Sequence, residues 1–88
     1  MSLTDREKDQ LAVAVQRAKD EYAKAVDVWT RSSGRAEASA NRAAQRLLSR
    51  YEILQMYVEK ALRGQGERYE MKALEYAAKV GGKKGRKR

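Results

Sequence analysis

The sequence predicts an all-α protein, built as an antiparallel helical hairpin of two long helices with a shorter C-terminal helix and a basic tail behind it. Two observations support this fold class. Apolar residues recur at intervals of three and four along most of the 88 residues, which is the spacing of one helix face. The chain has no proline, and its glycines gather at a few points where helices can end. These points divide a helical domain at 1–80 into helices at about 5–31, 35–63 and 67–79, followed by a flexible tail at 81–88.

The first helix, at about 5–31, is predicted to begin with a capping box. Thr4 stands three residues before Glu7, so each side chain can bond to the backbone N–H of the other residue. Apolar residues then follow at intervals of four and three and form a heptad seam, namely Leu11, Val15, Ala18, Tyr22, Ala25 and Trp29. Tyr22 and Trp29 could stack on a ligand or a base. We favour their packing inside the bundle near the hairpin loop, because both lie on the seam.

The second helix, at about 35–63, follows Gly34, which can take the left-handed conformation that ends the first helix. Ser32 and Ser33, just before it, can cap whichever helix end they meet. A link this short between two long helices usually joins them antiparallel. The apolar side of the second helix consists of Ala36, Ala40, Ala43, Ala44, Leu47, Leu48, Tyr51, Leu54, Val58, Ala61 and Leu62. This arc is roughly 140° wide when the sequence is wound as a helix, which is more than a single facing helix can cover.

The apolar residues of this chain are also small. It contains fourteen alanines, seven leucines and no phenylalanine, so each buried position removes little surface from water. A chain of 88 residues buries only a modest share of its surface on folding. We therefore expect it to complete its core by self-association or by docking on a protein partner.

Two glycines, Gly64 and Gly66, are expected to end the second helix. Helical spacing then resumes at about 67–79, where the apolar face consists of Met71, Leu74, Ala77 and Ala78. Tyr69 and Tyr76 lie away from this face and predict a second contact surface, through which the third helix could dock on another subunit. The pattern leaves open whether the third helix folds back on the hairpin or continues the second helix after a kink.

The net charge of +8 is concentrated in two places. Residues 1–34 and 67–80 each sum to zero, whereas residues 35–66 carry +3 and the end of the tail carries +5. The tail has no apolar side chain to bury, so it is expected to be flexible. A polyanion is expected to bind at these two basic places.

Each basic place offers residues that could contact phosphates. The tail supplies Lys83, Lys84, Arg86, Lys87 and Arg88, and the second helix supplies Arg35, Arg42, Arg46 and Arg50 within about 80° of one another. Ile53, Tyr57 and Lys60 continue the same face, so that Tyr57 could stack on a base or sugar. The alternatives are a solvated arginine face with Ile53 and Tyr57 filling a second helix contact, and a tail that only solubilises or anchors.

The sequence argues against catalysis, metal binding and membrane insertion. Cysteine and histidine are absent, so thiolate and imidazole ligands and nucleophile–histidine pairs cannot form. No pair of Asp, Glu, Lys or Tyr stands out from ordinary pairs on a helix surface, and no glycine-rich phosphate loop follows a strand. No segment is long and apolar enough to span a bilayer, and residues 1–10 are too charged for a signal peptide. We expect no enzyme activity, cofactor, small-molecule substrate or membrane partner.

Two functional hypotheses follow from these features. The first is a small non-enzymatic protein that binds DNA or RNA with weak sequence specificity through the arginines of the second helix and the tail. The second is a structural or assembly subunit of a larger particle, such as a virion or another nucleoprotein complex, whose helices dock on protein while the tail is an electrostatic anchor. Either hypothesis places the protein in the cytoplasm or within a nucleoprotein particle. The sequence does not distinguish DNA from RNA.

Overall fold

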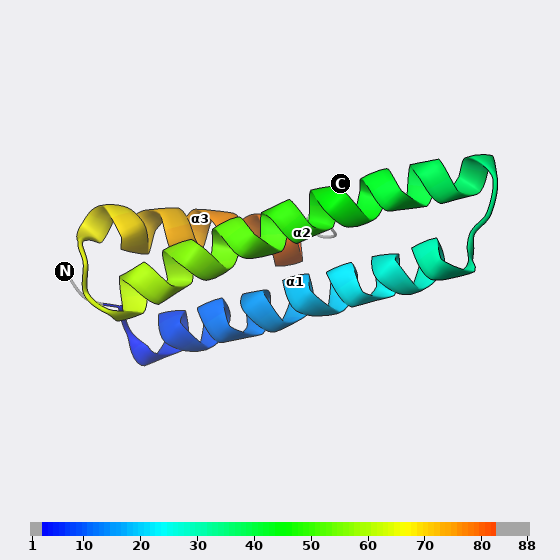
Figure 1. Cartoon of the computed structure of the whole chain (residues 1–88). Helices are drawn as coiled ribbons and strands as arrows, with labels where there is room; N and C mark the ends of the chain where they lie inside the picture. The colour runs from blue at the N-terminus through cyan, green and yellow to red at the C-terminus, as the bar shows by residue number, and fades with distance from the viewer. Residues whose placement is uncertain (1–2, 83–88) are drawn as a thin grey trace.

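The protein is a bundle of three α-helices in a computed structural model that describes residues 3–82 (Figure 1). The helices are α1 (Asp5–Arg31), α2 (Arg35–Leu62) and α3 (Glu67–Gly82). α1 and α2 form the expected antiparallel hairpin, and α3 folds back along it and contacts both helices. The described part of the chain contains helices and no strand, so the all-α prediction is confirmed.

The predicted capping box starts α1. The Thr4 backbone N–H donates to Glu7 Oε1 at 3.0 Å, and the Glu7 backbone N–H donates to Thr4 Oγ1 at 3.1 Å. At the other end, the Ser32 hydroxyl donates to the Val28 carbonyl at 2.7 Å and Ser32 N–H donates to the Trp29 carbonyl at 3.1 Å. Ser32 therefore caps the end of α1, as expected of the serines in this link, and the left-handed Gly34 does not end this helix.

The glycines at the two turns take backbone conformations that other residues rarely adopt. Gly34 has φ 64 and stands at the N-cap of α2, one residue before Arg35. Gly64 has φ 72 and closes α2 in a Schellman motif, where Gly64 N–H donates to the Ala61 carbonyl and Gln65 N–H donates to the Lys60 carbonyl, both at 3.1 Å. These bonds end α2 at Leu62, one residue earlier than predicted.

The core lies where the three helices meet. Its buried members are Leu3, Leu11, Ala14, Ala18, Leu54, Val58, Ala61, Ala73, Ala77 and Val80. Leu11, Leu54 and Val80 are the largest fully buried side chains. α3 runs to Gly82, three residues beyond its predicted end. The buried side chain of Val80 explains this, because it stabilises the last turn of the helix against the low helix propensity of glycine.

α3 packs on the hairpin by the side that carries Ala73, Ala77 and Val80, so the predicted face is only partly right. Tyr69 and Tyr76 are half-buried against the core, whereas Met71 is 64% exposed and Ala78 is exposed. Of the predicted apolar face of α3, Ala77 is buried and Leu74 is half-buried. A tyrosine ring buries more apolar area than a methionine or an alanine while its hydroxyl stays wet at the rim, so this packing removes more surface from water.

α3 covers only one half of the hairpin (Figure 1). We call residues 3–18 and 54–82 the three-helix half and residues 19–53 the two-helix half. In the two-helix half Ala44 alone reaches full burial, and Tyr22, Trp29, Leu47 and Leu48 are half-buried. Two members of the predicted apolar arc of α2, Ala36 and Leu62, are exposed near its ends, where no neighbouring helix covers them.

Candidate nucleic-acid interface

The four predicted arginines of α2 lie together in the two-helix half. Arg35, Arg42, Arg46 and Arg50 are all exposed, and we call them the arginine row. The last three stand four residues apart, so each step along the helix is about 6 Å and the row as a whole spans roughly 22 Å. The stack of Tyr76 of α3 on Tyr57 of α2 lies beyond the row.

The arginine row is free of carboxylate partners in the part of the chain that the structure describes. The salt bridges between residues 3 and 82 lie elsewhere, at Asp27–Arg31 (3.4 Å), Glu59–Arg63 (3.0 Å), Lys72–Glu75 (3.8 Å) and Glu75–Lys79 (3.9 Å). Each guanidinium of the row therefore keeps its fork of N–H donors for an external anion. That fork matches the oxygens of a phosphate better than an ammonium does.

Tyr57 and Lys60 are separated from the row by their contacts with α3. The ring of Tyr57 stacks on Tyr76, with centroids 5.4 Å apart and planes 12° apart, and lies 6.1 Å from the ring of Tyr69. Lys60 Nζ sits 5.3 Å from the centroid of the Tyr69 ring. One face of Tyr57 is therefore occupied by Tyr76, which is the helix contact of the alternative hypothesis.

The end of α3 lies level with one end of the arginine row. α3 runs antiparallel to α2, and the stacking of Tyr76 on Tyr57 fixes their register (Figure 1). Six residues later Gly82 is level with about Tyr51, at the end of the arginine row, since both helices rise about 1.5 Å per residue. The predicted tail residues Lys83, Lys84, Arg86, Lys87 and Arg88 follow Gly82 in the sequence and lie outside the described residues.

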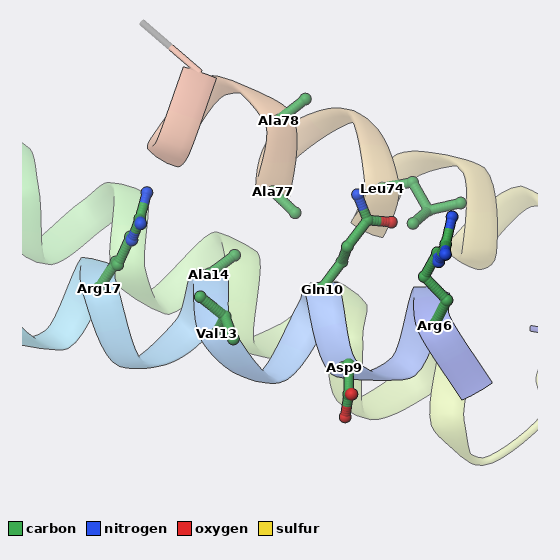
Figure 2. Close-up of a pocket in the computed structure, with 9 residues that line it drawn as sticks. All are labelled: Arg6, Asp9, Gln10, Val13, Ala14, Arg17, Leu74, Ala77 and Ala78. Atoms are coloured by element: carbon green, nitrogen blue, oxygen red, sulfur yellow. The ribbon is translucent and has the colours of Figure 1, made fainter. Parts of the chain in front are cut away.

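Hollows are found in both halves of the described bundle. A groove of about 540 Å³ runs between α1 and α3 (Figure 2) and is lined by Arg6, Asp9, Gln10, Val13, Ala14, Arg17, Leu74, Ala77 and Ala78. A shallower depression of about 420 Å³ in the two-helix half is lined by Glu21, Lys24, Ala25, Val28, Leu47 and Arg50. The groove could not be predicted from the sequence, because Asp9 and Arg17 lie opposite the heptad seam of α1 and the pattern does not tell where α3 lies.

The described residues contain no group of three or more carboxylates placed to hold a metal ion. Among residues 3–82 there is also no helix long and apolar enough to cross a membrane. A comparison of the chain with protein-family models, curated proteins and solved structures finds no match. Its function is therefore argued from its own residues.

Proposed function

We propose that this chain is a small, non-enzymatic nucleic-acid-binding protein that holds a phosphate backbone with weak sequence specificity. The observation that carries the proposal is the arginine row, which places four exposed guanidiniums on one strip of α2. None of them has a carboxylate partner among the described residues. The row ends level with the end of α3, after which the sequence continues into the five cations of the tail. Such a protein would act in the cytoplasm or within a nucleoprotein particle.

The row is arranged to follow a backbone. The steps of about 6 Å between Arg42, Arg46 and Arg50 are close to twice the rise of about 3.4 Å per base pair along one strand of a duplex, and Arg35 lies about 10 Å before Arg42. The cations of the tail can then extend the contact to neighbouring phosphates. Each neutralised phosphate releases a counterion, so binding is expected to weaken steeply as salt is added.

Weak specificity follows from the position of the amides in this part of α2. Asn and Gln are the side chains that read adenine edges in the major groove. The amides nearest the row are Asn41 and Gln45, and they are hydrogen-bonded to each other at 3.5 Å. At 100° per residue both lie on a different side of α2 from the row. The row therefore contacts phosphates, which position a protein without reporting sequence.

A salt titration of affinity for a duplex and for a single strand tests this proposal. Deleting residues 83–88 should reduce the log–log salt slope by about 3 to 4, given roughly 0.9 per neutralised phosphate of a duplex. Arg42→Ala with Arg46→Ala should lower the slope by about a further 2 by the same rule. The losses should be similar for every sequence tested.

The matched control is Arg31→Ala with Arg63→Ala. It removes the same two charges from arginines that already bond to Asp27 and Glu59, so the slope should change by less than about 0.5 under the same counterion rule. Equal salt slopes for the two double variants would show that the row contributes to binding only through the net charge of the protein. Binding too weak to measure at low salt would exclude the nucleic-acid hypothesis.

The second candidate function is that of a structural subunit of a larger particle. The observation in its favour is the apolar surface that the fold leaves uncovered, including Met71 at 64% and Val28 at 57% exposure. Large apolar side chains that cluster at the surface mark sites where proteins associate. If the tail deletion abolishes binding while Arg42→Ala with Arg46→Ala binds as wild type, this function becomes the better supported one, with the tail as its anchor.

A further inference from the structure

The side of the hairpin on which α3 packs continues beyond the end of α3 (Figure 1). In the three-helix half, Ala18 of α1 and Leu54 of α2 are buried in the core that α3 completes. One heptad farther from α3, the same sides of the two helices present Ala25 and Leu47, which are half-buried and line the shallower depression. α3 ends level with one end of the arginine row, so this depression lies where a longer α3 would run.

The floor of this depression, which we call the α1–α2 depression, is apolar and open to solvent. Val28 is 57% exposed and lines it together with Ala25 and Leu47. An apolar strip of this kind, on two adjacent helices in the place of a third, fits the apolar side of an amphipathic helix.

The charges beside this floor are mostly positive. Lys24 lines the α1–α2 depression on α1, and Arg50 lines it on α2. The arginine row continues this side of α2 through Arg46 and Arg42. None of these four cations forms an ion pair within residues 3–82. Glu21 is the one carboxylate among the lining residues. Charge complementarity therefore favours an occupant that brings carboxylates beside its apolar side.

The spacing of the arginines matches a helix. Arg50 stands one heptad from Tyr57, so it takes the place at which α2 receives Tyr76 of α3. An occupant with a carboxylate at that place would pair with the guanidinium. Arg42, Arg46 and Arg50 repeat every four residues, and carboxylates four residues apart on a second helix repeat at the same step of about 6 Å.

We propose that the α1–α2 depression binds an acidic amphipathic helix of a partner protein. The bound helix lies end to end with α3 and completes a three-helix bundle in the two-helix half. Its apolar side covers Val28 and Leu47, and carboxylates four residues apart pair with the arginine row. The row spans roughly 22 Å, which corresponds to about 15 residues of helix.

Other segments of this chain fit the depression less well. Residues 83–88 carry five cations and no apolar side chain, so they would add like charge and leave the floor uncovered. A second copy that packed through its own α1–α2 depression would bring the same excess of positive charge into the interface. α3 of a second copy is packed on its own hairpin, and residues 67–80 carry no net charge. Charge therefore selects a partner of different sequence.

The acidic helix and a nucleic acid would use the same arginines, so we expect them to compete. The helix site does not depend on the proposed function. Helix binding is measured without nucleic acid, and the salt titration is measured without the helix, so either proposal can fail alone.

A designed peptide tests the charge of the occupant. The probe is a labelled, helix-forming peptide of about 15 residues that carries leucines along one side and glutamates at intervals of four beside them. Fluorescence anisotropy with the full chain should show binding in the micromolar range, at least about tenfold tighter than for the same peptide with glutamines in place of the glutamates. Arg46→Ala with Arg50→Ala should weaken binding of the glutamate peptide by about tenfold, and the control Arg31→Ala with Arg63→Ala by less than about twofold.

A pair of valines on α1 tests the place of binding. Val28→Asp puts a charge on the floor of the depression and should weaken binding of the glutamate peptide by about tenfold. The matched control is Val13→Asp, which is 53% exposed on the same helix and outside the depression, and its effect should be less than about twofold. Both valines are exposed, so circular dichroism should show an unchanged helical fold.

Three results would overturn the proposal. They are no binding of the glutamate peptide at hundreds of micromolar, equal binding of the glutamate and glutamine peptides, and equal effects of Val28→Asp and Val13→Asp. If the peptide does not bind while Val28→Asp weakens binding of single-stranded DNA by about tenfold, the depression belongs to the nucleic-acid site and not to a partner helix.

Discussion

The three-helix half and the two-helix half use the same hairpin and differ in what covers it. In the three-helix half α3 closes the apolar sides of α1 and α2, and Leu11, Leu54 and Val80 become fully buried. In the two-helix half the same heptad pattern continues, yet Tyr22 and Trp29 stay half-buried. The comparison shows that a hairpin rich in alanine needs a third helix to bury its seam. The half without that helix keeps a side of α2 free for the arginine row.

The largest expected effect comes from shortening one leucine in each half. Leu54→Ala opens a cavity in the core and should lower the free energy of unfolding by about 3 kcal/mol. Leu47→Ala, at a half-buried site, should cost about 1 kcal/mol, because its surroundings are already partly wet. Urea unfolding followed by circular dichroism measures both. Equal losses would mean that the two halves are equally well packed and would break the comparison.

The tyrosine contact that holds α3 should have the next largest effect. Tyr76→Ala removes the stack on Tyr57 and a half-buried ring, and should cost about 2 kcal/mol of stability. Tyr76→Phe keeps the ring and should cost less than about 0.5 kcal/mol. Hydrogen exchange would locate the effect, since residues 67–82 should lose protection before residues 19–53 do. If both variants unfold at the wild-type urea concentration, the contact does not hold α3.

A smaller effect is expected at the start of α1, in the three-helix half. Thr4→Ala removes the acceptor of the 3.1 Å bond from Glu7 N–H and should destabilise the protein by about 1 kcal/mol. Thr4→Ser keeps that acceptor and should restore most of the loss. Urea unfolding measures both variants. An alanine variant as stable as wild type would show that this end of the bundle frays in solution.

The smallest expected effect on stability is at the arginine row, in the two-helix half. Arg42→Ala with Arg46→Ala should change the free energy of unfolding by less than about 0.5 kcal/mol, because both side chains are exposed, lack ion pairs within residues 3–82 and are replaced by the best helix former. Urea unfolding checks this directly. A large loss would show that the row supports the fold, and a binding defect of this variant could then not be assigned to phosphate contacts.

The sequence by itself determined where α1 begins and, to within one residue, where α2 ends. A capping box at Thr4 and a glycine C-cap at Gly64 act within a few residues, so their outcome follows from local hydrogen bonding and backbone sterics. The buried seam of α1 was also predictable, because the period of its apolar residues fixes one side of a single helix. The same helical periodicity predicted that the four arginines of α2 share one side of that helix.

Only the tertiary structure decided how α3 is used. α3 has two sides that can be buried, one with Tyr76 and one with Met71, and helical periodicity alone favoured the second. The choice depends on the surface that α2 offers, where Tyr57 receives Tyr76 in a stack. That contact withdraws Tyr57 from the predicted binding face, leaves Met71 outside and brings the end of α3 to Arg50. These outcomes depend on contacts between residues far apart in the sequence. A local pattern cannot choose between the two sides of α3, because it does not include the surface on which α3 packs.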